Sequence, residues 1–182
     1  MSYWDLEFQF CRKVIIFGES NVGKTCFAKR CELNTFIENP MRTIGVSVWW
    51  KKIEIDNVIH TFQFWDFSGE HKFRNLLRMY LKGVDIGIFM FDLGNLSTLL
   101  CFDYWVDYVK ENWERPLPII VIGTKGDEGH PEISARAKNF CLERHYPYYI
   151  ELSSKTGDNI PEVFQTLREL VQIIPHNQAY FN

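Results

Sequence analysis

The sequence predicts a three-layer α/β fold, in which helices cover both faces of a six-stranded, mostly parallel sheet with one antiparallel edge strand. Three observations favour this fold. Unbroken apolar runs, at 14–17, 86–91 and 119–122, are typical of strands buried on both faces. Segments with helical periodicity separate most of the strands, and such alternation connects parallel neighbours. Two β-rich stretches flank the turn signal Asp56-Asn57, and this hairpin would supply the antiparallel edge.

The elements follow from their local patterns in chain order. The first strand, 14–17, leads into a helix at 26–33, which is expected to turn Phe27, Cys31 and Leu33 inward. An exposed loop at 34–45 is expected next, followed by hairpin strands at 46–55 and 58–65 and a short irregular helix at 71–80. Strands are then expected at 86–91, 119–122 and 148–152, and helices at 99–113, 131–144 and 160–174. The helix at 131–144 is expected to bury Ala135, Phe140 and Cys141, and the helix at 160–174 has Pro161 in its first turn. Loops as long as 34–45 are usually functional.

Length and composition indicate one globular domain. The 182 residues are enough for a substantial core, and the hydrophobic content of 46% and charged content of 24% are ordinary. We expect a domain at 11–175 between an N-terminal extension at 1–10 and a short C-terminal tail at 176–182. The net charge of −3, with no long basic run, gives no support for a surface that binds nucleic acid or anionic membranes.

The cysteines and termini indicate a cytoplasmic protein. The five cysteines form no C-x-x-C pair and no zinc spacing, so buried thiols in a reducing compartment are expected. No apolar stretch approaches the length of a membrane span. The N-terminus has neither a signal-peptide pattern nor a myristoylation site, and the C-terminal residues contain no cysteine to prenylate. We therefore expect membrane association only through a partner or through a missing tail.

The main functional signal is the segment from Gly18 to Thr25, whose sequence G-E-S-N-V-G-K-T matches the G-x-x-x-x-G-K-[ST] pattern of a phosphate-binding P-loop. Gly18 and Gly23 permit backbone angles and close approaches that a Cβ would block. Consecutive N–H groups then point at the anion, and the helix that follows adds its positive N-terminal end. Lys24 would reach the β- and γ-phosphates, and the Thr25 hydroxyl would ligate Mg²⁺. The alternative is a Gly-rich turn with an exposed lysine, which the strand–loop–helix context disfavours. The expected nucleotide-binding residues of this segment are Gly18, Ser20, Asn21, Val22, Gly23, Lys24, Thr25 and Cys26.

Two further segments would complete a magnesium site. Asp66 and Gly69 form a D-x-x-G pattern after the 58–65 strand, where an Asp holds Mg²⁺ through water and the Gly N–H meets the γ-phosphate. Thr43 lies in the exposed loop, where its hydroxyl could complete the Mg²⁺ shell and its N–H could touch the γ-phosphate. In isolation each segment has an ordinary alternative, a polar strand end for Asp66 and a strand start for Thr43.

Two later loops suggest a guanine site. Asp127, in Thr124-Lys125-Gly126-Asp127, can accept hydrogen bonds from the ring N–H and exocyclic amino group of guanine, which adenine cannot offer. The stem of Lys125 would pack along the base. After the 148–152 strand, backbone N–H groups of Ser153, Ser154 and Lys155 could meet the guanine carbonyl oxygen. Taken alone, each loop is more simply an ordinary polar connection.

In this order and spacing, the segments resemble the Ras superfamily of small GTPases, and most closely the Rab family. The resemblance covers about residues 12–174. Thr43-Ile44-Gly45-Val46 is similar to the Rab-type end of switch I, and W-D-F-S-G-E-H-K-F-R at 65–74 is similar to the W-D-T-A-G-Q-E-R-F-R of switch II. The loop 124–127 stands for N-K-x-D, 153–155 stands for S-A-K, and Phe36 falls where the family has an aromatic residue near guanine.

The resemblance implies a P-loop NTPase fold for the domain at 11–175, which would bind GTP or GDP with Mg²⁺. Effector proteins would bind switch I and switch II in the region of Ile44, Trp65 and Tyr80. An exchange factor and a GTPase-activating protein (GAP) are implied as further partners. The implied metal-binding residues are Thr25, Thr43 and, through water, Asp66.

Departures from the family pattern fall at functional positions. Glu70 stands where relatives have the Gln that orients the attacking water. Gln donates and accepts hydrogen bonds, whereas ionised Glu only accepts them and brings negative charge towards a phosphate. Glu70 could act as a base if its pKa rose, but we expect slow hydrolysis or altered compatibility with a GAP. Thr124 replaces an Asn and lacks its second donor, so nucleotide would be held less tightly. Asn21 stands where many relatives have Gly, and the prenylated cysteines are missing.

The sequence thus predicts a GTP-binding switch with slow hydrolysis and a Rab-like role in membrane trafficking or signalling. One alternative is a nucleotide-binding interaction module that hydrolyses little or nothing. Another, a P-loop nucleoside kinase or ATPase, is disfavoured because Asp127 and the 153–155 loop fit guanine. The expected catalytic residues are Lys24, Thr43, Gly69 and Glu70.

Overall fold

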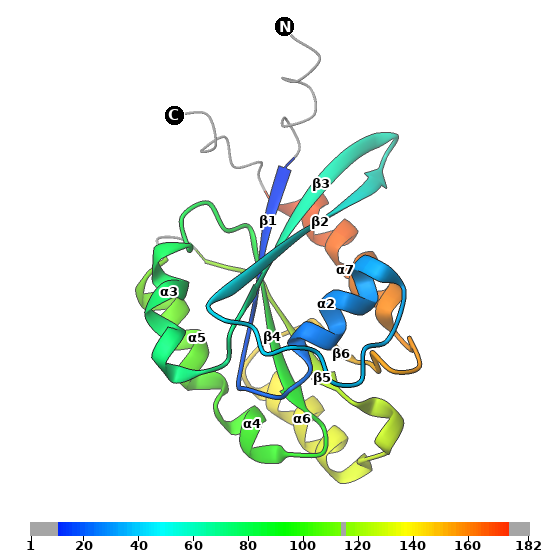
Figure 1. Ribbon diagram of the computed structural model, residues 1–182. Helices are drawn as coiled ribbons and strands as arrows, with labels where there is room; N and C mark the ends of the chain where they lie inside the picture. Colours follow the sequence, from blue (N-terminus) through cyan, green and yellow to red (C-terminus); the bar gives the residue numbers. More distant parts are fainter. Residues whose placement is uncertain (1–10, 114–115, 175–182) are drawn as a thin grey trace, which may run out of the picture.

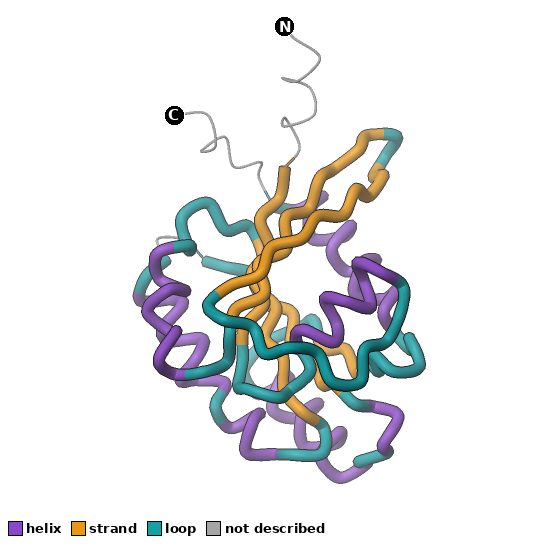
Figure 2. Tube along the Cα trace, viewed as in Figure 1, coloured by secondary structure: helices purple, strands orange, loops and turns teal. Residues whose placement is uncertain are grey.

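A computed structural model describes residues 11–113 and 116–174; the predicted N-terminal extension (1–10) and tail (176–182) lie outside the described residues. The chain forms a twisted six-stranded sheet with helices on both faces (Figure 1, Figure 2). The strands are β1 (Cys11–Phe17), β2 (Val46–Ile55), β3 (Val58–Phe67), β4 (Ile86–Asp92), β5 (Ile119–Thr124) and β6 (Tyr149–Glu151). The helices are α2 (Lys24–Leu33), α3 (Arg74–Met79), α4 (Leu96–Leu100), α5 (Phe102–Glu111), α6 (Pro131–Glu143) and α7 (Ile160–Ile173), with 3₁₀ turns η1 (His71–Phe73) and η2 (Gly126–Glu128).

The sheet order is β2-β3-β1-β4-β5-β6, and the β2–β3 pair is antiparallel while all other pairs are parallel. This confirms the predicted sheet. Asp56 and Asn57 close the hairpin with φ angles of 50° and 62°, the left-handed conformation that a two-residue hairpin turn requires. Strand β3 extends to Phe67, beyond its predicted end, because Asp66 still pairs with Ser47 of β2 and Ile16 of β1.

Two hydrophobic clusters, one on each face of the sheet, form the core. Helices α2 and α7 cover one face, and α3, α5 and α6 cover the other (Figure 1). The side chains of β1 divide between them, with Val14 and Ile16 in the first cluster and Ile15 and Phe17 in the second. All four are fully buried, which explains why the central strands have unbroken apolar sequences.

Two side chains that were predicted to face inward do not. Leu33 is 54% exposed, because it follows Cys31 by two positions, which is a rotation of about 200° around a helix axis. In α6 the buried alanine is Ala137 rather than the predicted Ala135, since Ala137 lies one helical turn before the buried Cys141.

The helix predicted at 99–113 is two helices, α4 and α5, which meet at Cys101. The first helix begins earlier than predicted because the side chain of Asn95 caps it, accepting a hydrogen bond from the Ser97 N–H at 3.2 Å. The cysteines are free thiols, although Cys26 and Cys101 are half-buried rather than buried. Within the described ranges no helix has both the length and the apolar character needed to cross a bilayer.

The direction of chain progression reverses at β1, because β3 and then β2 lie on one side of it while β4, β5 and β6 lie on the other. Loops that leave the carboxyl ends of parallel strands at such a point diverge and leave a crevice, where ligands of open α/β sheets bind. Most of the predicted functional residues lie after β1, β5 and β6 or at the end of β3 and just after it, whereas Phe36 and Thr43 lie on the loop 34–45 that precedes β2.

Candidate functional site

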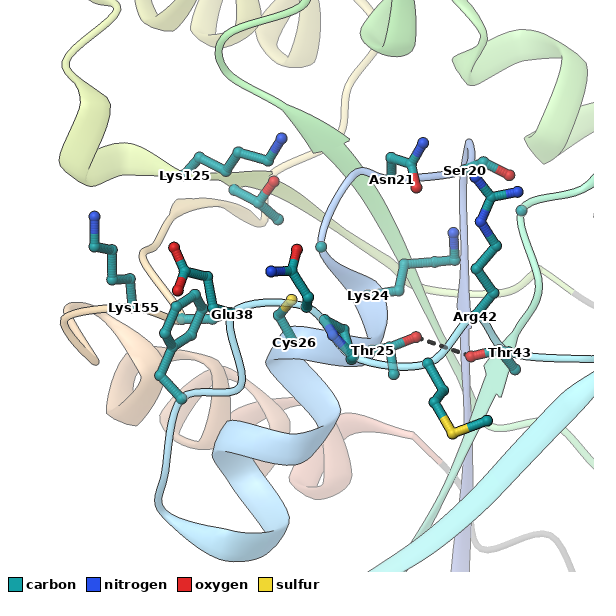
Figure 3. A pocket seen from close by; sticks show the side chains of 18 of the residues that line it. Ser20, Asn21, Lys24, Thr25, Cys26, Glu38, Arg42, Thr43, Lys125 and Lys155 are labelled. Carbon is teal, nitrogen blue, oxygen red and sulfur yellow. Dashed lines mark hydrogen bonds between the residues drawn. The ribbon is translucent and has the colours of Figure 1, made fainter.

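A cavity of about 550 Å³ lies at the carboxyl ends of the strands, a size that suits a small ligand or cofactor (Figure 3). Its walls come from the loop after β1, the loop 34–45, the segment after β3, and the loops after β5 and β6. The lining residues include Ser20, Asn21, Gly23, Lys24, Thr25, Cys26, Phe36, Glu38, Arg42, Thr43, Ser68, Gly69, Glu70, Thr124, Lys125, Asp127, Glu128, Ser154 and Lys155.

The loop between β1 and α2 has the geometry of a phosphate-binding turn. Gly18 has a φ of 136°, and a Cβ there would lie 2.2 Å from the carbonyl oxygen of Met90, so only glycine fits. Gly23, with a φ of 96°, precedes α2 and offers no side-chain cap, which leaves the N–H groups of the first helical turn available to a ligand. Lys24 is buried, and its Nζ donates to the carbonyls of Gly18 at 2.9 Å and Glu19 at 2.6 Å. Burial lowers the pKa of Lys24 to about 8, which the nearby Asp66 and Glu19 oppose.

Three side chains with oxygen atoms, those of Thr25, Thr43 and Asp66, lie next to this loop. The Thr25 and Thr43 hydroxyl oxygens are 2.9 Å apart, and Thr25 donates to Oδ2 of Asp66 at 2.9 Å. Asp66 is fully buried, and among the described residues its Oδ1 has no hydrogen-bond partner. Burial raises the pKa of Asp66, although Lys24 and the two threonines oppose the shift.

This donor set fits Mg²⁺, which prefers oxygen ligands and retains several waters. A buried carboxylate oxygen without a partner is costly unless a cation or a cation-bound water completes its shell. The described part of the chain contains no group of three or more His, Cys, Asp or Glu residues that could hold a metal ion.

Backbone contacts bring the segment after β3 against the phosphate loop. A Cβ on Gly69 would lie 2.3 Å from the Ser20 nitrogen, so a side chain at position 69 would force the two segments apart. The Ser68 N–H donates to the Gly45 carbonyl at 2.9 Å, which joins this segment to the end of the loop 34–45. The segment after β3 is therefore in contact with both the loop after β1 and the end of the loop 34–45.

Glu70 lines the cavity but forms an ion pair with Lys72 at 2.7 Å. The hydrogen bond from Lys72 lowers the pKa of Glu70, so its carboxylate is ionised at neutral pH. A lowered pKa makes Glu70 a weaker base, so the described conformation does not favour a role as a general base.

The far end of the cavity carries the residues predicted to read a base. Asp127 accepts a hydrogen bond from the buried Ser153 hydroxyl at 2.6 Å, and Lys155 Nζ lies 3.9 Å from its other oxygen. Lys125 Nζ forms an ion pair with Asp92 at 2.5 Å, which holds its stem beside the cavity. Ser153 thus fixes the orientation of the Asp127 carboxylate.

Thr124 joins the two ends of the site. Its hydroxyl oxygen lies 2.5 Å from the carbonyl oxygen of Val22, in the phosphate loop, and 2.9 Å from that of Phe91, in β4. A hydroxyl has one proton, so Thr124 can donate fully to only one of these two carbonyls at a time.

The segment after Gly69 is fastened to α5. Glu19 accepts a hydrogen bond from Trp105 Nε1 at 2.8 Å through one carboxylate oxygen, and its other oxygen lies 3.5 Å from His71 Nε2. His71 Nδ1 lies 3.0 Å from the Tyr104 hydroxyl. Arg74 donates to the Tyr104 carbonyl at 2.8 Å, and its guanidinium lies 3.6 Å from the centre of the Tyr104 ring. Glu19 therefore connects the phosphate loop to both elements.

Most predicted site residues line the cavity, with four exceptions. The residues that do not line the cavity are Gly18, Val22, Asp66 and Ser153. Val22 contacts the lining residue Thr124 through its carbonyl, and Ser153 donates a hydrogen bond to the lining residue Asp127. Eight further lining residues were not predicted from the sequence, namely Glu38, Asn39, Pro40, Met41, Arg42, Phe67, Ser68 and Glu128. Arg42 had an available signal, since it immediately precedes Thr43.

An exposed apolar surface adjoins the cavity. Ile44 is 82% exposed, and the rings of Trp65 and Tyr80, both half-buried, are 5.1 Å apart. Met79, at the end of α3, is 71% exposed. These residues come from the loop 34–45, from β3, and from the end of α3 with the residue that follows it. The surface therefore combines the loop that carries Thr43 with the segments on either side of Gly69.

Residues 13–173 match the family model described as the Ras family. Among similar proteins, Ras-related protein Rab-11B of Dictyostelium discoideum is 27% identical over 163 residues, which cover 89% of this chain and 74% of the relative. Ypt/Rab-type GTPase ypt7 of Schizosaccharomyces pombe is 31% identical over 165 residues, covering 87% and 80%. Human Ras-related protein Rab-30 is 29% identical over 169 residues, covering 92% and 82%. A family match over this much of the chain confirms the resemblance seen in the motifs, and the protein belongs to the Ras family of small GTPases.

Proposed function

We propose that this protein is a GTP-binding molecular switch that requires Mg²⁺ and hydrolyses GTP slowly to GDP. One observation carries the proposal. A single cavity has a phosphate-binding loop at one end and an oriented carboxylate, Asp127, at the other. A guanine nucleotide needs both ends at once, since its polyphosphate seeks N–H groups and cations while its base donates two hydrogen bonds to a carboxylate.

Lys24 and the N–H groups of the phosphate loop would offset the charge on the β- and γ-phosphates. Thr25 and Thr43 would ligate Mg²⁺ directly and Asp66 through water, and the bound ion would neutralise phosphate charge. Gly69 would contribute its N–H to the γ-phosphate, and Asp127 would select guanine. Because Thr43 and Gly69 lie on two loops joined by the Ser68–Gly45 hydrogen bond, loss of the γ-phosphate would release both loops.

Slow hydrolysis is proposed because of Glu70. The residue at this position in the family orients the attacking water, and an ionised carboxylate cannot donate a hydrogen bond. The ion pair with Lys72 favours the ionised form of Glu70. The same observation favours the second candidate, a nucleotide-binding interaction module that hydrolyses little or no GTP.

Single-turnover hydrolysis of preloaded GTP separates the two candidates. We expect measurable turnover by the native protein and compare it with Glu70→Gln, using Glu162→Gln, an exposed residue in the first turn of α7, as the control for loss of one carboxylate. A large acceleration in Glu70→Gln, with turnover by the native protein at background, would favour the interaction module. Equal or faster hydrolysis by the native protein would exclude it.

The identity of the bound nucleotide tests whether the protein binds guanine nucleotides at all. GDP or GTP should copurify with the protein, and ATP should fail to displace labelled GDP. Displacement by ATP at comparable concentration would instead favour the P-loop nucleoside kinase or ATPase.

We further propose a Rab-like role in membrane trafficking or signalling, since the relatives named above are Rab-type proteins. The surface of Ile44, Trp65 and Tyr80 would bind effectors in the GTP state, and an exchange factor and a GAP would act on the same segments. The protein would be cytoplasmic and would reach membranes through a partner or a further tail. Pull-down with protein loaded with a non-hydrolysable GTP analogue, against GDP-loaded protein, tests this role.

A further inference from the structure

Arg42 brings a cation to the phosphate end of the cavity. It lies in the loop 34–45, immediately before Thr43, and it lines the cavity together with Ser20, Gly69 and Glu70. In Figure 3 its side chain extends from the backbone beside Thr43 towards Ser20, on the side of the cavity where Lys24 lies. The other cavity-lining cations, Lys125 and Lys155, belong to the opposite end, near Asp127.

The guanidinium of Arg42 is available for a ligand. Within residues 11–113 and 116–174 it forms no hydrogen bond and no ion pair within 4 Å, and its one electrostatic interaction is a weak attraction to the carboxylate of Glu70. Glu70 already has a closer partner in Lys72, at 2.7 Å, and Lys72 does not line the cavity. Lys72 therefore offsets the negative charge of Glu70 from outside the cavity, whereas the side chain of Arg42 lines the cavity.

The charges at this end favour an anion of high charge. Lys24 and Arg42 both line this end of the cavity, where Asp66 and Glu19 offset part of the charge of Lys24, and an anion between the two cations would be attracted by both. Glu70 is one negative charge at the rim and is compensated by Lys72. An arginine fork matches phosphate oxygens with two parallel hydrogen bonds, which a lysine cannot make.

We infer that Arg42 binds the γ-phosphate of GTP, so that the loop 34–45 carries its own cation that distinguishes GTP from GDP. The inference rests on the proposed function. The γ-phosphate is the part of the nucleotide that Arg42 would reach. Arg42 immediately precedes Thr43, and Glu70, to which Arg42 is weakly attracted, immediately follows Gly69. Thr43 and Gly69 are the two residues expected to contact that phosphate. GDP lacks it and would leave the Arg42 side chain in solvent.

Equilibrium titration with GDP and with a non-hydrolysable imido analogue of GTP tests this assignment. In Arg42→Ala we expect the affinity for the GTP analogue to fall by about tenfold or more, the range for a lost hydrogen bond to a charged group. The affinity for GDP should change by less than about twofold, as expected for an exposed charge without a contact. Arg42→Lys should fall between, since it keeps the charge and loses the fork.

Arg136→Ala is the matched control, because Arg136 is an exposed arginine of α6 that does not line the cavity. It should leave both affinities unchanged. An equal change, or no change, in the two affinities of Arg42→Ala would overturn the assignment to the γ-phosphate. If the native protein bound neither nucleotide, the proposed function itself would fail, which is a different result.

A second measurement separates direct contact from simple compensation of Glu70. If Arg42 touches the γ-phosphate, Arg42→Ala should still weaken binding of the GTP analogue by about tenfold when Glu70→Gln is already present. If Arg42 only screens the charge of Glu70, the loss should vanish in that background, and the direct contact would be refuted.

Discussion

Replacing Thr124 by Asn should slow the release of nucleotide. The Thr124 hydroxyl oxygen lies within hydrogen-bond distance of two carbonyls, that of Val22 in the phosphate loop and that of Phe91 in β4, but it has one proton to share between them. The amide of Asn has two N–H donors and can satisfy both carbonyls at once. The phosphate loop would then be tied to the base-binding loop at all times.

The magnitude follows from the number of hydrogen bonds. One added neutral hydrogen bond contributes about 1 kcal/mol net, so the release rate of GDP should fall by about fivefold. Thr124→Val keeps the shape and removes the donor, so it loses the shared bond and should speed release by a similar factor. Thr124 is 2% exposed, so the Asn variant needs a thermal-denaturation control for overpacking.

The assay is the dissociation of fluorescent GDP chased by excess unlabelled GDP. Thr166→Val is the matched control, because Thr166 is a buried threonine of α7 that does not line the cavity. An unchanged release rate in both Thr124 variants, with the fold intact, would refute the view that this hydroxyl couples the two loops.

Two further predictions concern lysines of β1 and α2. Lys24→Ala should abolish retention of nucleotide, because it removes a charge-assisted contact to two phosphates; an unchanged GDP content after purification would refute the phosphate-loop assignment. Burial lowers the pKa of Lys13 to about 8 from its ordinary 10.5, while Asp85 opposes the shift. Between these two pH values the unfolded chain keeps the proton that the folded chain has lost, so stability relative to Lys13→Met should rise as pH increases from 8 to 10.5. Urea denaturation of both proteins across this range measures the change, and a constant difference would contradict it.

The sequence was sufficient to predict the sheet because burial on both faces leaves a direct trace in the residues. Val14 to Phe17 are apolar without alternation, and the hairpin turn at Asp56-Asn57 uses residues that tolerate a left-handed backbone. The direction of single helical side chains was harder to predict. A shift of two positions turns a side chain by about 200°, and this is why Leu33 was placed on the wrong face.

The site was predictable where chemistry imposes residue types at fixed spacing, as for Lys24, Thr25 and Asp66. It was not predictable where tertiary packing chooses the partner. Glu19 and Trp105 are separated by 86 positions, and nothing local to either residue indicates their hydrogen bond. Arg42 lies in a loop without periodicity, so its place next to Thr43 was the one sequence signal for it, and the direction of its side chain could not be predicted.

Glu19 has both of its carboxylate oxygens engaged, one by Trp105 of the α5 core and one by His71. The residue does not line the cavity, yet it belongs to the loop that does. A substitution at Trp105 would therefore free one oxygen of a phosphate-loop residue and alter nucleotide kinetics without touching the ligand. If nucleotide exchange changes in a Trp105 variant that keeps its thermal stability, the change would reflect the lost hydrogen bond to Glu19 rather than a damaged fold.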